Sequence, residues 1–266
     1  MLLAIDIGNT NTVFALFKGR DVVHSWRCKS EKSRSADEYA VFLSQMFGLI
    51  NRPLDLVSAV IVSSVVPDAN FHIAQFCRKY LSCEALFVDA GKVDLQIDLD
   101  QPEEIGADRI VNAVAVMAYY SAPAIVIDFG TATTFDVIDE GGLHCGGVYR
   151  GGVIAPGIRL SIEALTTRAA KLPQISIENP GKVIGRNTRA AMKSGMYWGY
   201  IGLIEGIVSK IKDEMGKDMQ VIATGGLAPL YSQSTDVIDY VDDELIFKGL
   251  LEIYQVQQNK EETGDL

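Results

Sequence analysis

Residues 2–12, LLAIDIGNTNT, join a short apolar run to an acid, a glycine and small polar residues. The run has the length and composition of a buried strand, and the apolar residues 13–17 predict a second strand after a tight turn. Gly8 lets the backbone approach a ligand closely, and turn amides can point at phosphate oxygens. Asp6 would repel a phosphate, so its position implies a cation between them, most simply Mg²⁺. A plain hairpin with a solvated Asp6 explains the stretch equally well when it is taken alone.

The pattern occurs a second time as IVIDFGTATT, residues 125–134. The offset is 122 residues, close to half the chain, and it relates Asp6 to Asp128, Gly8 to Gly130 and Thr12 to Thr134. An internal repeat at half length indicates a duplicated domain. Two such hairpins would grip a polyphosphate from both sides, so the repeat favours a phosphate site over two unrelated turns.

Composition limits the classes of protein that remain. The chain has 266 residues, of which 48% are hydrophobic and 22% charged, as in ordinary globular proteins. Its formal net charge of −10 argues against binding to nucleic acid or to an anionic membrane surface. The same charge means that an anionic substrate must be held by local donors.

The cysteines and histidines show no metal-binding spacing; they are Cys28, Cys77, Cys83, Cys145, His24, His72 and His144. Without a C-x-x-C pair or a His/Cys cluster, structural zinc is not expected. The cysteines are expected to be free thiols in a reducing compartment, and so we expect a cytoplasmic protein. The three histidines are expected to be structural.

One uncharged stretch, residues 110–127, approaches the length of a membrane span. Asn112, Ser121 and Pro123 interrupt it. A buried helix to Tyr120, followed by a strand after the Pro123 turn, explains it better. The N-terminal apolar run is interrupted by Asp6 and no basic segment precedes it, so no secretion signal is expected.

Periodicity and turn residues predict the remaining elements. Strands are expected at residues 2–5, 13–17, 21–27, 56–66, 86–88 and 221–223, and a hairpin begins at Ile125 and continues in a strand to Ile138. Helices are expected at 35–47, 67–80, 110–120, 158–165, 187–212 and 245–255. Ser35 stands three residues before Glu38, as in a capping box. An acidic, weakly structured segment is expected at 92–104, a Gly-rich span at 141–157, and a frayed tail at 257–266. In each half three strands from hairpins precede alternating helices and strands, which predicts two α/β domains with mixed sheets, 1–121 and 122–266, around a shared cleft.

Asp108 and Arg109 are the candidates for the acceptor site. An Arg guanidinium can bind a carboxylate through two parallel hydrogen bonds, and an adjacent Asp could accept the proton of a hydroxyl that is being phosphorylated. The alternative for Asp108 is a first-turn acid that interacts with the helix dipole. Thr188 is likewise either a ligand or a helix cap. Gly225 and Gly226 follow a strand and either let a ring or phosphate approach or simply form a turn.

These motifs together resemble type III pantothenate kinase, a bacterial family of the acetate and sugar kinase, heat-shock chaperone and actin superfamily. The resemblance covers nearly the whole chain and rests on Asp6-Ile7-Gly8-Asn9-Thr10, Gly106-Ala107-Asp108-Arg109, residues 128–133 (DFGTAT) and 151–157 (GGVIAPG), Asn187-Thr188 and Gly225-Gly226. It implies two duplicated ribonuclease H-like domains with mixed five-stranded sheets flanked by helices and a cleft between them. It also implies transfer of the γ-phosphate of ATP to pantothenate, the first step toward coenzyme A.

The resemblance further implies roles for single residues. ATP and Mg²⁺ would be held by Asp6, Ile7, Gly8, Asn9, Thr10, Asn11, Thr12 and Val13, with Asp6 acting on Mg²⁺ through water, and the nucleotide also by Thr131, Gly225 and Gly226. Pantothenate would be held by Gly106, Ala107, Asp108, Arg109 and Thr188, with Asp108 as the general base and Arg109 on the substrate carboxylate. Asp128 would help to bind a monovalent cation, K⁺ or NH₄⁺. Leu99 stands where many relatives carry a Tyr that contacts pantothenate.

The family also implies a homodimer, and the Gly-rich, aromatic face of the helix after Asn187 would suit its interface. Two alternatives remain: a kinase for another small hydroxy acid or sugar, which Leu99 keeps open, and a non-catalytic nucleotide-binding regulatory protein.

Overall fold

The computed structural model describes residues 1–141, 146–169 and 172–263. The chain divides into two compact units, each an α/β structure. The first consists of Met1–Leu95, Asp100–Tyr119 and Leu245–Leu266, and the second of Gln96–Leu99 and Tyr120–Glu244. His144, Cys145 and part of the Gly-rich span lie outside the described residues.

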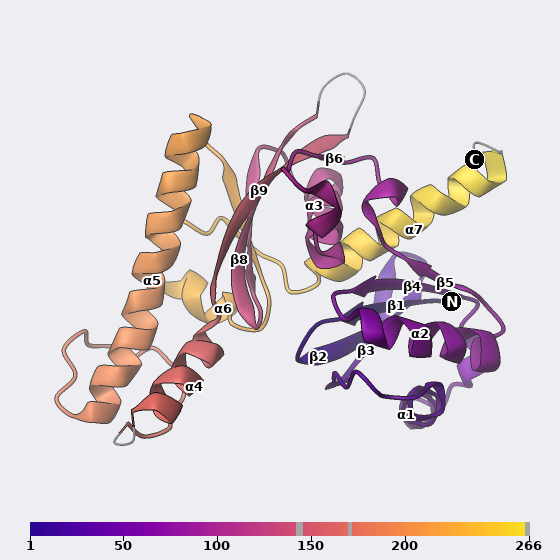
Figure 1. Ribbon diagram of the computed structural model, residues 1–266, viewed down its shortest axis with the longest axis horizontal. Coiled ribbons are helices and arrows are strands. Elements are labelled where there is room, and N and C mark those ends of the chain that lie inside the picture. The colour runs from indigo at the N-terminus through magenta and orange to yellow at the C-terminus, as the bar shows by residue number, and fades with distance from the viewer. Residues whose placement is uncertain (142–145, 170–171, 264–266) are drawn as a thin grey trace. The chain divides into compact units, whose positions relative to one another are not determined.

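The elements are drawn in Figure 1. The first unit contains β1 (Leu2–Ile7), β2 (Asn11–Lys18), β3 (Asp21–Lys29), α1 (Ala36–Leu49), β4 (Ala59–Ser64), α2 (Pro67–Phe76), a π-helical turn (Cys77–Leu81), β5 (Ala85–Phe87), α3 (Ala107–Tyr119) and α7 (Leu245–Thr263). The second contains β6 (Gln96–Ile97), β7 (Ala124–Phe129), β8 (Ala132–Glu140), β9 (Gly147–Pro156), α4 (Ile158–Arg168), α5 (Thr188–Met215), β10 (Gln220–Thr224), α6 (Ala228–Tyr231) and β11 (Tyr240–Val241).

The first sheet has the strand order β3-β2-β1-β4-β5. It is mixed, because β1 pairs antiparallel with β2 and parallel with β4. One face packs on α1 and α2, whose apolar residues Tyr39, Leu43 and Ile73 are almost fully buried. The other face packs on α3 and α7. The Ser35–Glu38 capping box predicted for the start of α1 is present.

The second sheet repeats the same topology. Its order, β11-β10-β7-β8-β9-β6, matches the first when β7, β8, β9, β10 and β11 are set against β1, β2, β3, β4 and β5. Helix α5 runs along one face of this sheet (Figure 1), where Ile204 and Val208 pack against Ile125 and Val221. The predicted duplication and the α/β class with mixed sheets are confirmed.

The prediction of five strands is wrong for the second sheet, which has six strands in the described part of the chain. The sixth is β6, two residues of the acidic segment that pair in parallel with Val148 and Tyr149. A strand this short carries no alternating pattern by which a sequence could indicate it.

The sequence pattern predicts a third strand in the second half but no bounds for β9, because β9 falls in the Gly-rich span and glycine is disfavoured in strands. Gly152 explains the exception: a Cβ atom there would lie 2.1 Å from the Phe135 carbonyl oxygen of β8. Glycine therefore allows β9 to approach β8 closely. The pairing is irregular between Val137 and Ile138, near Gly151 with its φ of +105°.

Helix α7 changes the expected division at residues 121 and 122. It continues to Thr263, beyond the predicted end at 255, and packs in the first unit, where Leu250 and Leu251 join the apolar cluster beneath α3. Gly249 brings the two helices together, since a Cβ atom at this position would lie 2.1 Å from the Val111 carbonyl oxygen. The short-range helical pattern predicted α7 but could not indicate which sheet it would cover.

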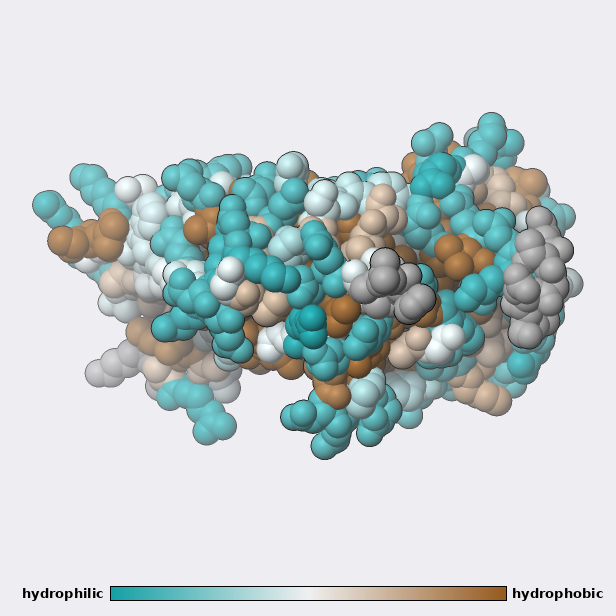
Figure 2. Space-filling view, turned by 90° about the horizontal axis from the view of Figure 1, so that it is seen from above, coloured by the Kyte–Doolittle hydropathy of each residue, from teal (hydrophilic) through white to brown (hydrophobic). Residues whose placement is uncertain are grey.

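On the face drawn in Figure 2, hydrophilic residues predominate and hydrophobic ones appear in small patches. Among the described residues, no helix combines the length and the apolar character that crossing a membrane requires.

Gly249→Ala is expected to lower the free energy of unfolding by about 1–3 kcal/mol, because the added methyl group overpacks the α3–α7 contact. Thermal or urea unfolding measures the change. Gly48→Ala is the matched control, since Gly48 also lies in a helix but has open space around it. That control should be unchanged or slightly more stable. A Gly249→Ala protein as stable as the Gly48→Ala protein would contradict the close helix contact.

Candidate active site

Asp6 lies at the end of β1, between Val13 of β2 and Ser63 of β4 in the strand register. Its neighbours Ile5 and Ile7 pack toward α1 and α2, so alternation directs Asp6 to the face covered by α3 and α7. Asp6 is partly buried. The sheet thus holds this carboxylate in a fixed position on the α3 side, next to the hairpin turn.

The turn after β1 is fastened by Ser30. Its hydroxyl donates to the Gly8 carbonyl oxygen at 2.6 Å and lies 2.9 Å from the Thr12 hydroxyl, and its backbone N–H donates to the Thr10 carbonyl oxygen. Gly8 donates to the Asn11 carbonyl oxygen across the turn, and a Cβ atom on Gly8 would approach that oxygen within 3.3 Å. Gly8, which has no side chain, and Ser30, which lies outside the turn, therefore hold the conformation of the hairpin that the sequence predicts as a phosphate site.

Asp108 lies in the first turn of α3. Its Oδ1 accepts a hydrogen bond from the Arg109 backbone N–H at 2.9 Å. The carboxylate folds back over Gly106, where a Cβ atom would lie only 2.5 Å from Oδ1. Burial raises the pKa of Asp108, although the Arg109 backbone and charge act in the opposite direction. The first-turn interaction considered for Asp108 is present, but it leaves a desolvated carboxylate that is a better base than an exposed one.

Asp6 and Asp108 interact electrostatically. Burial, and next the negative charge of Asp108, raise the pKa of Asp6 to about 7, while Ser63 and Arg27 act in the opposite direction. Two carboxylates that repel each other form a place where a cation is stabilised.

The residues at Asp6 fit a Mg²⁺ ion of the kind that accompanies a nucleotide. Mg²⁺ usually keeps several waters and binds through one or two carboxylates plus substrate phosphates. In the described part of the chain, no group of three or more His, Cys, Asp or Glu side chains could enclose a metal. A site with Asp6 as its protein ligand therefore suits an ion that arrives with phosphate.

Asp128 and Gly225 lie next to each other at the second hairpin, where β7 and β10 end. Asp128 at the end of β7 pairs in register with Thr224 of β10, and Gly225 follows with a φ of +88°. A Cβ atom on Gly225 would lie 2.8 Å from the Phe129 carbonyl oxygen and 2.9 Å from Asp128 Oδ1. Gly225 is therefore required both by its backbone conformation and by two oxygens that converge beside it.

Gly157 sits equally close to the second turn, since a Cβ atom there would lie 2.1 Å from the Thr131 carbonyl oxygen. Thr131 itself is exposed at the tip, as is Gly226 after β10. The structure thus brings Asp128, Thr131 and Gly225 together within the second unit.

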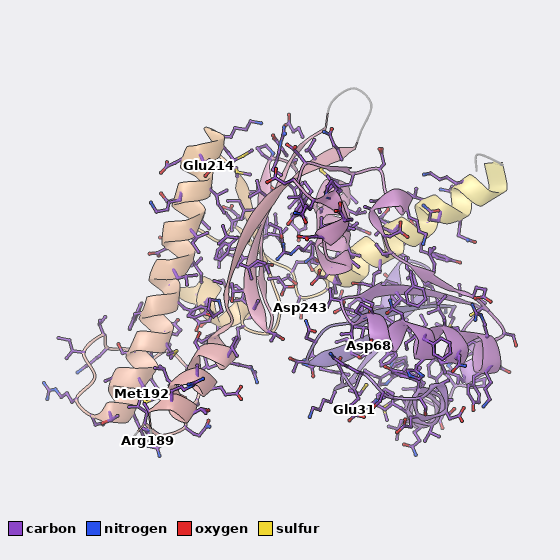
Figure 3. The ribbon with its side chains drawn as sticks, viewed as in Figure 1. Glu31, Asp68, Arg189, Met192, Glu214 and Asp243 are labelled. Atoms are coloured by element: carbon purple, nitrogen blue, oxygen red, sulfur yellow. The ribbon has the colours of Figure 1, made fainter. Side chains whose placement is uncertain are left out.

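Thr188 and Leu99 lie elsewhere in the second unit. Thr188 begins α5 and is exposed. The next residue, Arg189, is labelled in Figure 3. The cap is the neighbour of Thr188, Asn187, whose side chain accepts from the Ala190 N–H at 2.9 Å, so capping does not account for Thr188. Leu99 packs beside Gly151 of β9. The adjacent Asp98 pairs with Arg150 at 2.6 Å, which holds this segment on the sheet edge.

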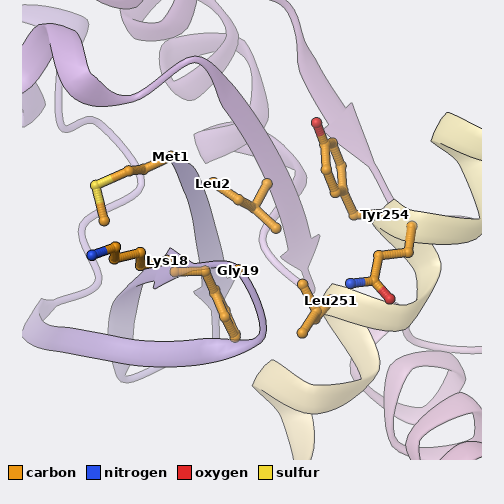
Figure 4. Close-up of a pocket in the computed structure, with 8 residues that line it drawn as sticks. Met1, Leu2, Lys18, Gly19, Leu251 and Tyr254 are labelled. Atoms are coloured by element: carbon orange, nitrogen blue, oxygen red, sulfur yellow. The ribbon is translucent and has the colours of Figure 1, made fainter.

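A separate cavity of about 340 Å³ opens between the start of β1, the β2–β3 turn and α7 (Figure 4). Leu2, Lys18, Leu251 and Tyr254 are among its lining residues. None of the expected site residues lines this cavity, so it is not the candidate active site.

Sequence reasoning missed Ser30 and Ser63. Both are serines in segments expected only as a loop and a strand end, and serine is common in such places. The strand pairing that brings Ser63 beside Asp6 is visible only in the folded chain.

The fold occurs in solved structures of low sequence identity. A Campylobacter jejuni protein described as a Baf family transcriptional activator has a TM-score of 0.58, with 20% identity over 97% of this chain and 99% of its own. The activator of 2-hydroxyisocaproyl-CoA dehydratase from Clostridium difficile, with bound ADPNP, also has a TM-score of 0.58, with 14% identity over 100% and 97% of the two chains. At these identities the likeness shows the fold alone, which both structures share with this chain over nearly its whole length.

Sequence comparison is more specific. Residues 2–210 match the family described as type III pantothenate kinase. A type III pantothenate kinase of Paramagnetospirillum magneticum is 54% identical over 259 residues, which are 96% of this chain and 97% of its own. The chain belongs to the type III pantothenate kinase family, and so to a family of kinases.

Without Mg²⁺ and nucleotide, Asp6 should make the stability of the protein depend on pH. Its carboxyl keeps a proton up to about pH 7 in the folded state but has an ordinary value of 3.8. The folded state is therefore disfavoured progressively as the pH rises between these two values. Asp6→Asn removes this loss. In EDTA at pH 8 the variant should therefore have a higher melting temperature than the wild type, and the difference between the two should be smaller at pH 5. The exposed Asp68, in the first turn of α2, supplies the control variant Asp68→Asn. The same difference at both pH values would contradict the raised pKa.

Proposed function

We propose that the protein transfers the γ-phosphoryl group of ATP to the terminal hydroxyl of pantothenate, which is the first step toward coenzyme A. The observation that carries the proposal is the partly buried Asp108 carboxylate beside Asp6 in a member of this family. Phosphoryl transfer needs aligned reactants, charge neutralisation and a base near the acceptor.

Asp108 acts as the general base in this proposal. It takes the hydroxyl proton as the pantothenate oxygen forms a bond to the γ-phosphorus, and the bond from that phosphorus to the ADP oxygen breaks. Its raised pKa makes it a stronger acceptor for that proton. Arg109, adjacent on α3, holds the pantothenate carboxylate by its guanidinium.

The remaining residues bind and orient. Residues 6–13 hold the phosphates through turn amides. Asp6 would hold Mg²⁺ through water, and the ion would supply charge neutralisation. Thr131, Gly225 and Gly226 hold the nucleotide, and Thr188 contacts pantothenate. Leu99 offers only an apolar contact where many relatives have a Tyr hydroxyl.

Asp128 holds a monovalent cation, K⁺ or NH₄⁺, in the proposed enzyme. The support is the convergence of Asp128 Oδ1 and the Phe129 carbonyl oxygen beside Gly225. Carboxylate and carbonyl oxygens are the groups that replace the hydration shell of K⁺.

The direct test is incubation of the protein with ATP, Mg²⁺, K⁺ and pantothenate, followed by detection of phosphopantothenate by mass spectrometry. Product formation supports the proposal. Phosphorylation of another small hydroxy acid or sugar, without phosphopantothenate, would favour the alternative that Leu99 leaves open. Nucleotide binding without any phosphorylated acceptor would favour a regulatory protein.

Asp108→Asn should keep ATP and pantothenate binding but lose turnover by about 100-fold or more, the scale expected for a general base. Steady-state kinetics and calorimetric titration measure the two effects. Asp68→Asn is again the matched variant, because Asp68 is also a first-turn acid but is exposed (Figure 3). Near-normal turnover of Asp108→Asn would remove Asp108 from the base role.

Replacing K⁺ by Na⁺ should abolish activity, because the smaller ion does not match oxygens placed for K⁺. Initial rates in KCl, NH₄Cl and NaCl at equal ionic strength measure this. Equal rates in all three salts would argue against the role of Asp128.

We also propose that the protein is a cytoplasmic homodimer. The support is on α5, where Gly195, Gly199, Gly202 and Gly206 fall on one exposed side with open space around them. Four glycines cost this helix about 1 kcal/mol each relative to alanine, which favours a use for the bare surface. Nearby Val183 and Ile184 are 64% and 83% exposed. The free thiols of Cys28, Cys77 and Cys83 suit a reducing compartment.

Gly199→Arg should convert the dimer to a monomer, since a long charged side chain would project from the proposed interface. Size-exclusion chromatography with light scattering measures the mass. Gly48→Arg on α1 serves as the control, because Gly48 also has open space around it. A monomeric wild-type protein, or a Gly199→Arg protein that stays dimeric, would exclude this interface.

A further inference from the structure

A single row of side chains crosses the first sheet at the level of Asp6. The strand register sets Asp6 opposite Val13 of β2, and Val13 opposite Arg27 of β3. Residues directly opposite each other project from the same face of a sheet. Arg27 therefore projects from the same face as Asp6, on the outermost strand.

Packing on both faces agrees with this assignment. Val13 belongs to the cluster that includes Ile110 of α3. Trp26 and Cys28, which flank Arg27 in β3, pack in the opposite cluster with α1 and α2. Since side chains alternate along a strand, Arg27 must point to the α3 side.

Arg27 is exposed, and no described residue forms an ion pair or a side-chain hydrogen bond with its guanidinium. Neighbouring strands are about 4.8 Å apart, so two strand spacings place its Cα about 10 Å from that of Asp6. The side chain of arginine is long enough to extend over much of this span. The positive charge of Arg27 already acts on Asp6, because it lowers the pKa of that carboxyl against the larger effect of burial.

The proposed reaction needs a positive charge at this place. The chain has a net charge of −10, so a triphosphate must be attracted by nearby groups. The hairpin offers neutral amides, and Arg109 is assigned to the pantothenate carboxylate. A guanidinium binds two phosphate oxygens at once, and an arginine that stabilises the transferred phosphoryl group recurs in phosphoryl-transfer enzymes.

We propose that Arg27 binds the terminal phosphate of ATP held at the first hairpin. This inference rests on the proposed function only for its ligand, Mg²⁺-ATP, and does not depend on pantothenate. Lys29, two residues further along β3, projects from the same face and adds to the positive potential without sharing the row of Asp6.

The competing explanation is that Arg27 only protects an edge. Charged side chains on edge strands discourage pairing with other chains. Lys18 provides a matched comparison, because it is an exposed cation at the other end of β2 in the same sheet. An edge role predicts no change in nucleotide binding, and a general charge effect predicts similar losses when Arg27 or Lys18 is neutralised.

The test compares two nucleotides by isothermal titration calorimetry with Mg²⁺: ADP, and the ATP analogue with an imido group between the β- and γ-phosphates. Arg27→Gln should weaken binding of the analogue by about 10-fold or more, the scale of a lost charge-assisted hydrogen bond, and change ADP binding by less than about 3-fold. Arg27→Lys keeps the positive charge but loses the guanidinium that can bind two phosphate oxygens. Its affinity for the analogue should lie between those of the wild type and Arg27→Gln. Lys18→Gln should bind both nucleotides as the wild type does.

Unchanged binding of the analogue, or equal losses for the analogue and ADP, would overturn the proposal. Melting temperatures report whether each variant is folded, and Arg27→Lys supplies the comparison if Arg27→Gln is unstable. A wild-type protein that binds the analogue but does not phosphorylate pantothenate would refute the proposed function, while the same titrations would still decide the role of Arg27. Failure of the wild type to bind the analogue would overturn both.

Discussion

The repulsion between two carboxylates, Asp6 and Asp108, is the constraint on which the candidate site depends. Asp6 is fixed by the pairing of β1 on both sides, and Asp108 by the packing of α3 on the same sheet face. Partial burial raises both pKa values, so the two groups are held where ionisation is unfavourable. The surrounding core must offset that cost. The fold thereby gives Asp108 an increased proton affinity, as a base requires. It also creates a position at Asp6 where a cation that accompanies a phosphate is stabilised.

Much of the fold could be predicted because its signals are local or repeated. The apolar runs ending in Asp6 and Asp128 indicated two hairpins, and their common offset indicated the duplication that both sheets show. The features that the sequence did not indicate, the bounds of β9 and the existence of β6, depend on distant partners. Strand β9 tolerates its glycines because β8 requires a close approach there, and β6 exists only through its pairing with β9. Neither cause is visible in a short window of sequence.

The candidate site shows the same difference between residues that local motifs indicate and residues that depend on distant partners. Short motifs in which each residue type has a chemical reason were sufficient to propose five of the site residues: Asp6, Gly8, Asp108, Asp128 and Gly225. Ser30 and Ser63 carry no such signal. Ser30 acts by fastening the Gly8 turn from the end of β3, and Ser63 acts because β4 lies against β1. Arg27 is a similar case, since an arginine on an amphipathic strand indicates only a solvated face until strand register relates it to Asp6.

Helix α7 has a consequence for the order in which the protein is assembled during translation. The second unit, Tyr120–Glu244 with Gln96–Leu99, is inserted within the sequence of the first. On the ribosome, one face of the first sheet lacks Phe247, Leu250 and Leu251 until α7 has left the exit tunnel. Since domains generally fold as units while the chain emerges, the inserted unit can fold first. The β1–β2 hairpin, which is synthesised before the inserted unit, thus reaches its final surroundings only after that unit is complete, and a nascent chain released before Leu245 would expose an apolar face.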